Sequence, residues 1–243
     1  VNVPQIMDTF TKQTGYPLVT VQEEVDNGNG SATLKLKQSR FLLDGTTDDQ
    51  LWNIPMTIAI YSQEHGERII KHIFNGTVSG STDTITIPQF NAATDYVILN
   101  SNQTGFYRVQ YTNQMLNKLA KAIASKKITS ASDRLGILSD AISIARAGKS
   151  SVKSFLELIE TAYVGTETEY IVWSEIASII AYLSSILAEE PYFEKYQAYC
   201  RRVFAPVYQK LGWEKQGKED ASTQMLRALA ISRMIEANDP SAL

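Results

Sequence analysis

The spacing of apolar residues changes near residue 112, and this change constrains the fold more than any other feature of the sequence. Before it, apolar and polar residues alternate, which is typical of strands with one buried face. One such face would carry Trp52, Ile54, Met56, Ile58 and Ile60, opposite a polar face with Asn53, Thr57 and Tyr61. Shorter alternating runs at 33–37, 84–87 and 107–111 are separated by Asn-Gly turn pairs. Residues 17–112 are therefore predicted to form an antiparallel β-sandwich of six or seven short strands.

From Asn113 onward, apolar residues recur with the period of an α-helix. The clearest stripe contains Phe155, Leu158, Ile159, Ala162 and Tyr163. About six such helices follow one another with short connections, which predicts antiparallel neighbours. We therefore expect residues 113–243 to form an all-α domain, an incomplete solenoid of HEAT- or armadillo-like helix pairs.

Several residue types mark where these helices should begin and end. The pairs at 130–133 (Ser and Asp) and 166–169 (Thr and Glu) are spaced like capping boxes, and Pro191 suits a first helical position. Pro206 should kink or end the helix that starts near Pro191, because proline lacks an amide donor. Helix ends are predicted at three glycines, Gly148, Gly165 and Gly212.

Residues 1–16 fit neither pattern. The segment 4–14 reads as one short helix with Ile6, Met7 and Phe10 on its apolar side and Gly15 at its end. A helix of that length is marginal unless its apolar side packs on something else. We interpret residues 1–16 as the last helix of a preceding domain, and we expect both ends of the chain to be cut from a longer protein.

The composition excludes several classes of protein. The 243 residues carry 23 basic and 26 acidic side chains, and this net charge of −3 argues against nucleic acid as a partner. Cys200 is the single cysteine, so internal disulfides are impossible and a reducing, cytoplasmic location is expected. The longest apolar run, 176–188, lies between Glu175 and Glu189 and is shorter than the roughly 20 residues that span a membrane.

Motifs that carry chemistry are missing from the sequence. His65 and His72 are the two histidines, too few for a zinc hydrolase site with three protein ligands, and no His-Glu-x-x-His motif occurs. The sequence also has no Gly-x-Ser-x-Gly elbow and no phosphate-binding loop. Cys200 is interpreted as a small core residue rather than a reactive thiol. We therefore predict no catalytic and no metal-binding residue in this chain, and its substrate-binding residues stay unassigned.

Tyr192, Tyr196 and Tyr199 share one stripe of a predicted helix. Such a stripe can line a groove that binds a peptide, or it can form the seam between two stacked helices with the hydroxyl groups at its rim. The seam is the more frequent arrangement and is favoured here. The groove would suit a stand-alone module that binds peptides or proteins and has no enzymatic role.

Short motifs occur in a fixed order along nearly the whole chain, at 7–17, 52–55, 100–111, 133–148, 172–174 and 204–213. In order, they include Met7-Asp8, Trp52-x-Ile54-Pro55, Gly105-Phe106-Tyr107-Arg108, Asp133-Arg134-Leu135 and Phe204-Ala205-Pro206. Together they resemble the M1 family of zinc aminopeptidases, and most closely its cytosolic puromycin-sensitive branch. Phe10 departs from the pattern, because the family usually has Trp there.

The resemblance implies an architecture and not a catalytic site. It implies the end of a catalytic domain (1–16), a β-sandwich spacer (17–112) and the first part of a helical bowl over the active site (113–243). The family's zinc-binding His-Glu-x-x-His motif has no counterpart here, so zinc is expected in the full-length parent and no cofactor in this chain. The expected partners are the catalytic domain and, through the parent, a peptide whose N-terminal residues are removed. A carbohydrate-binding sandwich is a weaker alternative that rests on Trp52 alone.

Overall fold

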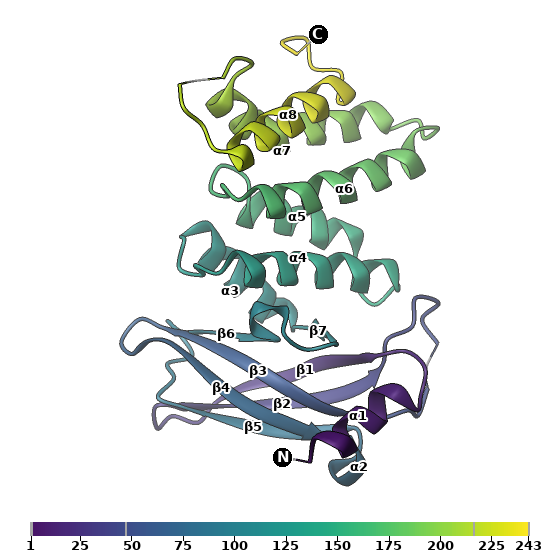
Figure 1. Cartoon of the computed structure of the whole chain (residues 1–243), viewed down its shortest axis with the longest axis vertical. Coiled ribbons are helices and arrows are strands. Elements are labelled where there is room, and N and C mark those ends of the chain that lie inside the picture. Colours follow the sequence, from purple (N-terminus) through teal and green to yellow (C-terminus); the bar gives the residue numbers. More distant parts are fainter. Residues whose placement is uncertain (1, 47, 216, 243) are drawn as a thin grey trace.

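The computed structural model describes residues 2–46, 48–215 and 217–242. Figure 1 shows β-sheets at one end of the molecule and a stack of helices that extends away from them to the C-terminus. The first helix, α1 (Val3–Thr11), lies beside the sheets and is capped by the side chain of Asn2. The predicted short N-terminal helix is therefore confirmed.

Two sheets follow α1. One has the strand order β5-β2-β1-β7 and the other the order β4-β3-β6. The strands are β1 (Pro17–Asp26), β2 (Ser31–Arg40), β3 (Asn53–Ser62), β4 (Gly66–Asn75), β5 (Thr82–Pro88), β6 (Tyr96–Leu99) and β7 (Arg108–Gln110). Two short helical segments, α2 (Gly76–Ser79) and η1 (Ser101–Gln103), lie between them.

The sheets are not entirely antiparallel, which corrects the prediction from the sequence. Strand β7 pairs with β1 in parallel, with Val19 opposite Val109. The reason lies in the connection at η1, because it carries the chain from β6 in one sheet to β7 in the other. An alternating pattern identifies a strand, but it does not identify the partner or the direction of pairing.

Apolar side chains of both sheets form one shared core. The predicted inward face of β3 is confirmed, since Trp52, Ile54, Met56, Ile58 and Ile60 are all buried. The opposite face of β3 differs from the prediction at both ends. Asn53, at the start of the strand, is buried. The end of the strand differs as well. There Ala59 and Tyr61 are also buried, and they belong to the core of the helices instead.

After residue 112 the described part of the chain contains six helices, as predicted. They are α3 (Asn113–Ala124), α4 (Ala131–Arg146), α5 (Val152–Ala162), α6 (Tyr170–Leu187), α7 (Phe193–Leu211) and α8 (Ala221–Glu236). In Figure 1 they stack in chain order, with α3 and α4 next to the sheets and α7 and α8 farthest from them. Their buried faces form a second continuous core.

The predicted helix boundaries are correct at α4 and wrong at two other places. The Ser130 hydroxyl caps α4 by accepting a hydrogen bond from the Asp133 N–H, at 3.1 Å. Thr166 caps nothing: its hydroxyl donates to the Ala162 carbonyl, and α6 begins after Glu169. Pro191 lies in the turn before α7 rather than in its first turn. Side chains that bond backward along the chain compete with capping.

Pro206 does not end its helix, because α7 continues to Leu211. The residues on both sides of it, Val203, Phe204, Val207 and Tyr208, are buried in the helical core. Their packing holds the last turn in place although Pro206 supplies no N–H donor. The predicted end at Gly148 is confirmed: it has a positive φ of 69°, and the following Lys149 N–H bonds to the Ile144 carbonyl.

By its length and composition, α6 is the one helix in the described ranges that could cross a membrane. Core helices of soluble proteins pass the same test. In this structure Val172, Trp173, Ile176 and Ile180 of α6 are buried against other helices.

Candidate functional site

His65 and His72 do not come together. His65 is exposed in the turn between β3 and β4, whereas His72 lies on β4 with its Nε2 2.8 Å from the Asp83 carboxylate on β5. No group of three His, Cys, Asp or Glu side chains in the described ranges could hold a metal ion. The donor set of these residues therefore does not fit a zinc site, and we derive no chemical step through one.

Cys200 is a buried core residue, as predicted. Burial raises the pKa of its thiol to about 11, because a thiolate would lose its hydration there. The side chain thus stays protonated at neutral pH, and it is a poor nucleophile.

Tyr196 and Tyr199 form a seam between helices, which is the arrangement favoured by the sequence. Both are buried, and their hydroxyls donate to the carbonyls of Ile180 (2.9 Å) and Leu156 (3.1 Å) on other helices. Tyr192 is about half exposed in the turn before α7. Two of the three tyrosines are therefore unable to line an open groove.

The most elaborate polar arrangement lies where α4 meets the sheets. Asp133 and Asp140 are seven residues apart on α4, so they share one face of the helix, and both are buried. The Asp133 carboxylate accepts hydrogen bonds from the Tyr61 hydroxyl of β3 (2.9 Å) and the Asn102 N–H of η1 (2.5 Å). One carboxylate thus joins α4 to both a strand and the turn that leads to β7.

Gly136 of α4 packs against the side chain of Gln103 in η1. A Cβ atom on Gly136, which lies between the two aspartates, would be 1.8 Å from Nε2 of Gln103. The side chain of Gln103 therefore occupies the space that any larger residue at position 136 would need.

Asp140 makes the second connection, to β7. Its carboxylate accepts from the Val109 N–H (2.9 Å) and from Nη1 of Arg108 (3.0 Å). Burial raises the pKa of Asp140 to about 6, although both donors act in the opposite direction. The Arg108 guanidinium also lies over the rings of Tyr16 and Phe41, 6.0 and 5.5 Å from their centroids. The segment before β1, strand β7 and helix α4 are therefore connected through one arginine.

Arg134, next to Asp133, points toward the following helices instead. Its Nε and Nη2 bind both oxygens of Glu167, at 2.7 and 3.0 Å, in the loop before α6. Burial favours a higher pKa for Glu167, but the hydrogen bonds from Arg134 and from backbone N–H groups lower it overall. The Tyr163 hydroxyl donates to the Arg134 carbonyl at 2.8 Å. Consecutive residues of α4 thus bind the sheets on one side and the next helix pair on the other.

We define the junction as Tyr61, Asn102, Arg108, Asp133 and Asp140. Their polar atoms already hold partners on another element, so the junction positions secondary structure and offers no nucleophile paired with a base. None of the five is predicted from the sequence to have this role. The sequence did contain a signal for this role. Two aspartates seven residues apart on an otherwise apolar helix face predict buried carboxylates, and buried carboxylates need hydrogen-bond donors.

Comparison with known proteins identifies the family of this chain. The family model described as the ERAP1-like C-terminal domain matches residues 96–243, from the start of β6 to the end of the chain, and so includes four of the five junction residues. Among curated relatives, puromycin-sensitive aminopeptidase of Caenorhabditis elegans is 30% identical over 240 residues, covering 97% of this chain and 24% of the relative.

Two further relatives show similar coverage. Aminopeptidase M1-D of Oryza sativa subsp. japonica is 29% identical over 238 residues (96% of this chain, 26% of the relative). Glutamyl aminopeptidase of Mus musculus is 29% identical over 251 residues (99% and 24%). The chain thus spans about a quarter of the length of these relatives. It belongs to the ERAP1-like C-terminal domain family, and it corresponds to the C-terminal portion of M1 aminopeptidases.

Proposed function

We propose that this chain is the non-catalytic spacer and cover of a zinc aminopeptidase that removes N-terminal residues from peptides. One observation carries the proposal: alignments that include nearly all of this chain occupy about a quarter of each aminopeptidase. The described donor residues do not fit a zinc site, so the zinc of the parent is expected outside this chain. There zinc would polarise the scissile carbonyl and activate water.

We further propose a division of the chain into three parts. Residues 1–16 end the catalytic domain, 17–112 form a β-sandwich spacer, and 113–243 begin an α-solenoid. The shared core between the two sheets supports the sandwich, and the chain-order stacking of helices in Figure 1 supports the solenoid. A solenoid offers a long curved surface suited to enclosing an extended peptide.

In this proposal the junction sets how the helices sit on the sheets. Asp133 and Asp140 both lie on α4, and each binds a backbone N–H as well as a side chain. The helical cover is thereby held at a fixed angle to the spacer beneath it. We propose a cytoplasmic location, no nucleic-acid partner and no membrane insertion, in line with the single buried thiol and the net charge of −3.

The test compares this chain with the longer protein encoded by its natural reading frame. We expect the longer protein to hydrolyse aminoacyl-fluorophore substrates and this chain to hydrolyse none, with or without added zinc. Zinc-dependent turnover by the pure 243-residue chain that disappears in a His65→Ala variant would contradict the proposal. Tight binding of unfolded peptides by this chain alone would instead favour a stand-alone binding module, which the buried Tyr196 and Tyr199 do not favour.

A further inference from the structure

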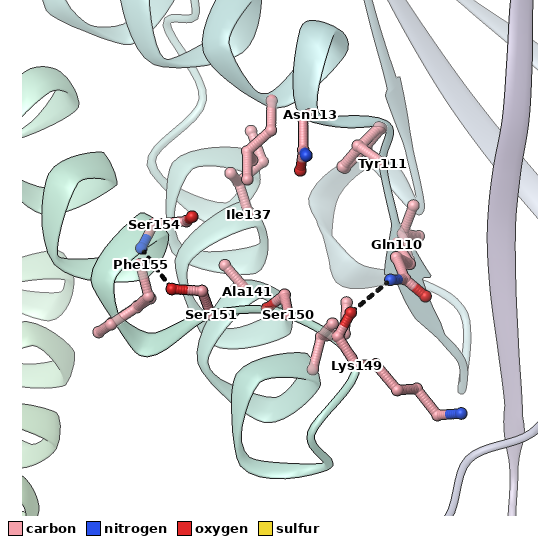
Figure 2. Close-up of a pocket in the computed structure, with 13 residues that line it drawn as sticks. Gln110, Tyr111, Asn113, Ile137, Ala141, Lys149, Ser150, Ser151, Ser154 and Phe155 are labelled. Carbon is pink, nitrogen blue, oxygen red and sulfur yellow. Dashed lines mark hydrogen bonds between the residues drawn. The ribbon is translucent and has the colours of Figure 1, made fainter. Parts of the chain in front are cut away.

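A cavity of about 210 Å³ lies beside the junction, between β7 and the helices α3, α4 and α5. Figure 2 shows its lining residues, with Gln110 and Tyr111 on the side of the strand and Ser151, Ser154 and Phe155 on the opposite side. A single water needs about 10–15 Å³ of such space, so the cavity is large enough for a small organic molecule. It opens to solvent on the side of the exposed Asn113, Ser150, Ser151 and Ser154.

The lining of the cavity is divided into an apolar floor and a polar rim. Val109, Ile137, Ile144 and Phe155 form the floor, and all four are buried. The rim carries exposed amide and hydroxyl groups from Asn113, Ser150, Ser151 and Ser154. This division matches a molecule with an apolar body and one polar end.

The charges around the rim favour a negative polar end. None of the described lining residues is acidic, whereas Lys149 belongs to the lining. The ion pairs found in the described ranges do not include Lys149. In Figure 2 its side chain leads outward from the rim, away from the floor, so the ammonium would have to turn back to reach a group bound at the rim. Asn113, the first residue of α3, and Ser151, the N-cap of α5, also lie at this rim, and helix N-termini carry partial positive charge.

We propose that this cavity binds a small amphipathic carboxylate, with its apolar body on the floor and its carboxylate at the rim beside Lys149. A bound molecule would touch β7 on one side and α4 and α5 on the other. It would therefore stabilise the attachment of the helices to the sheets next to Asp140, which bonds to the same strand. This inference stands on the cavity and does not depend on the aminopeptidase assignment.

The probe is 4-methylpentanoate, compared with its neutral isostere 4-methylpentanamide. Binding is followed by the backbone amide signals of Gln110, Ser151 and Ser154 in the 243-residue chain. We expect the carboxylate to bind with a dissociation constant on the order of 1 mM, and the amide about threefold more weakly. No shift of these signals at about 20 mM carboxylate, or equal affinity for both probes, would overturn the proposal.

Two pairs of variants locate the binding. Ser154→Leu fills the rim and should abolish binding, whereas Ser178→Leu, at an exposed position of α6 outside the cavity, should not change it. Lys149→Gln should weaken binding of the carboxylate about threefold and leave the amide unaffected. Lys153→Gln is the control, since Lys153 is exposed on α5 outside the lining and pairs with Glu157. Because Ser154 is exposed, its replacement should not prevent folding, and unchanged affinity in the Ser154 variant would contradict the assigned position.

Discussion

At Asp140 two opposing effects act on one carboxyl group. Burial disfavours its charge, whereas the Val109 N–H and the Arg108 guanidinium favour it. The effect of burial is the larger one, so the pKa of Asp140 is raised from 3.8 to about 6. A folded-state pKa above the unfolded value means that the group stabilises the fold at low pH and that this contribution is lost as the pH rises through 6. The full shift corresponds to about 3 kcal/mol, at about 1.4 kcal/mol per unit.

An Asp140→Asn variant cannot titrate at this position. Between pH 5 and pH 7, we therefore expect the free energy of unfolding to fall by about 1 kcal/mol more in the unmodified chain than in this variant. Asparagine keeps an oxygen that can accept from the Val109 N–H. Asp140→Ala removes this acceptor, and a buried donor without a partner costs about 1–3 kcal/mol. At pH 7 the asparagine variant should therefore be more stable than the alanine variant. Urea unfolding at the two pH values measures both differences. The exposed Asp49→Asn is the control, and a pH dependence shared by all three variants would show that Asp140 is not the titrating group.

Single residues also show what the sequence could and could not predict. The inward face of β3 and the burial of Cys200 followed from alternation and from residue type, since both are local properties. Tyr61 did not, because it was placed on the polar face, and what buries it is α4, more than 70 residues later in the chain. A residue that packs on a helix so far away in the chain does not change the apolar pattern of its own strand, so the local sequence cannot predict the contact.

At the scale of elements, α7 shows a local rule overridden by packing. Proline inside a helix removes one hydrogen bond and crowds the preceding turn, at a cost of about 3 kcal/mol. The helix nevertheless passes through Pro206, because buried residues flank it on both sides. Strand β7 is similar: its alternation was visible in the sequence, whereas its parallel pairing with β1 depends on how η1 turns the chain.

We expect Pro206→Ala to stabilise the chain, by up to about 3 kcal/mol, because alanine restores the missing N–H donor and is the best helix former. Thermal unfolding followed by circular dichroism at 222 nm measures the change. Ala205→Gly, one position earlier on the same helix, should destabilise by about 1 kcal/mol, and it shows that the assay responds to helix propensity. A lower melting temperature for Pro206→Ala would mean that the proline ring contributes packing that alanine cannot replace.

At the scale of the whole molecule, the sheets and the helices have separate cores that meet at the junction. Ala59, Tyr61 and Ile98 of the strands pack into the helical core, and Asp133 and Asp140 bind the strands from α4. The proposed roles of spacer and cover need this connection to be as stable as either core. The most protected amides in β3 and in α6 should therefore exchange with solvent hydrogen through the same global opening, with equal opening free energies.

Asp133→Ala tests this coupling, because it leaves the buried Tyr61 hydroxyl without its acceptor and removes the partner of the Asn102 N–H. We expect the opening free energies of β3 and α6, measured by native-state hydrogen exchange, to separate by about 1–3 kcal/mol in this variant. Asp49→Asn should leave them equal. Unequal values in the unmodified chain would show that the helices open independently of the sheets. The junction would then act as a hinge, and the helices could tilt on the sheets without unfolding either core.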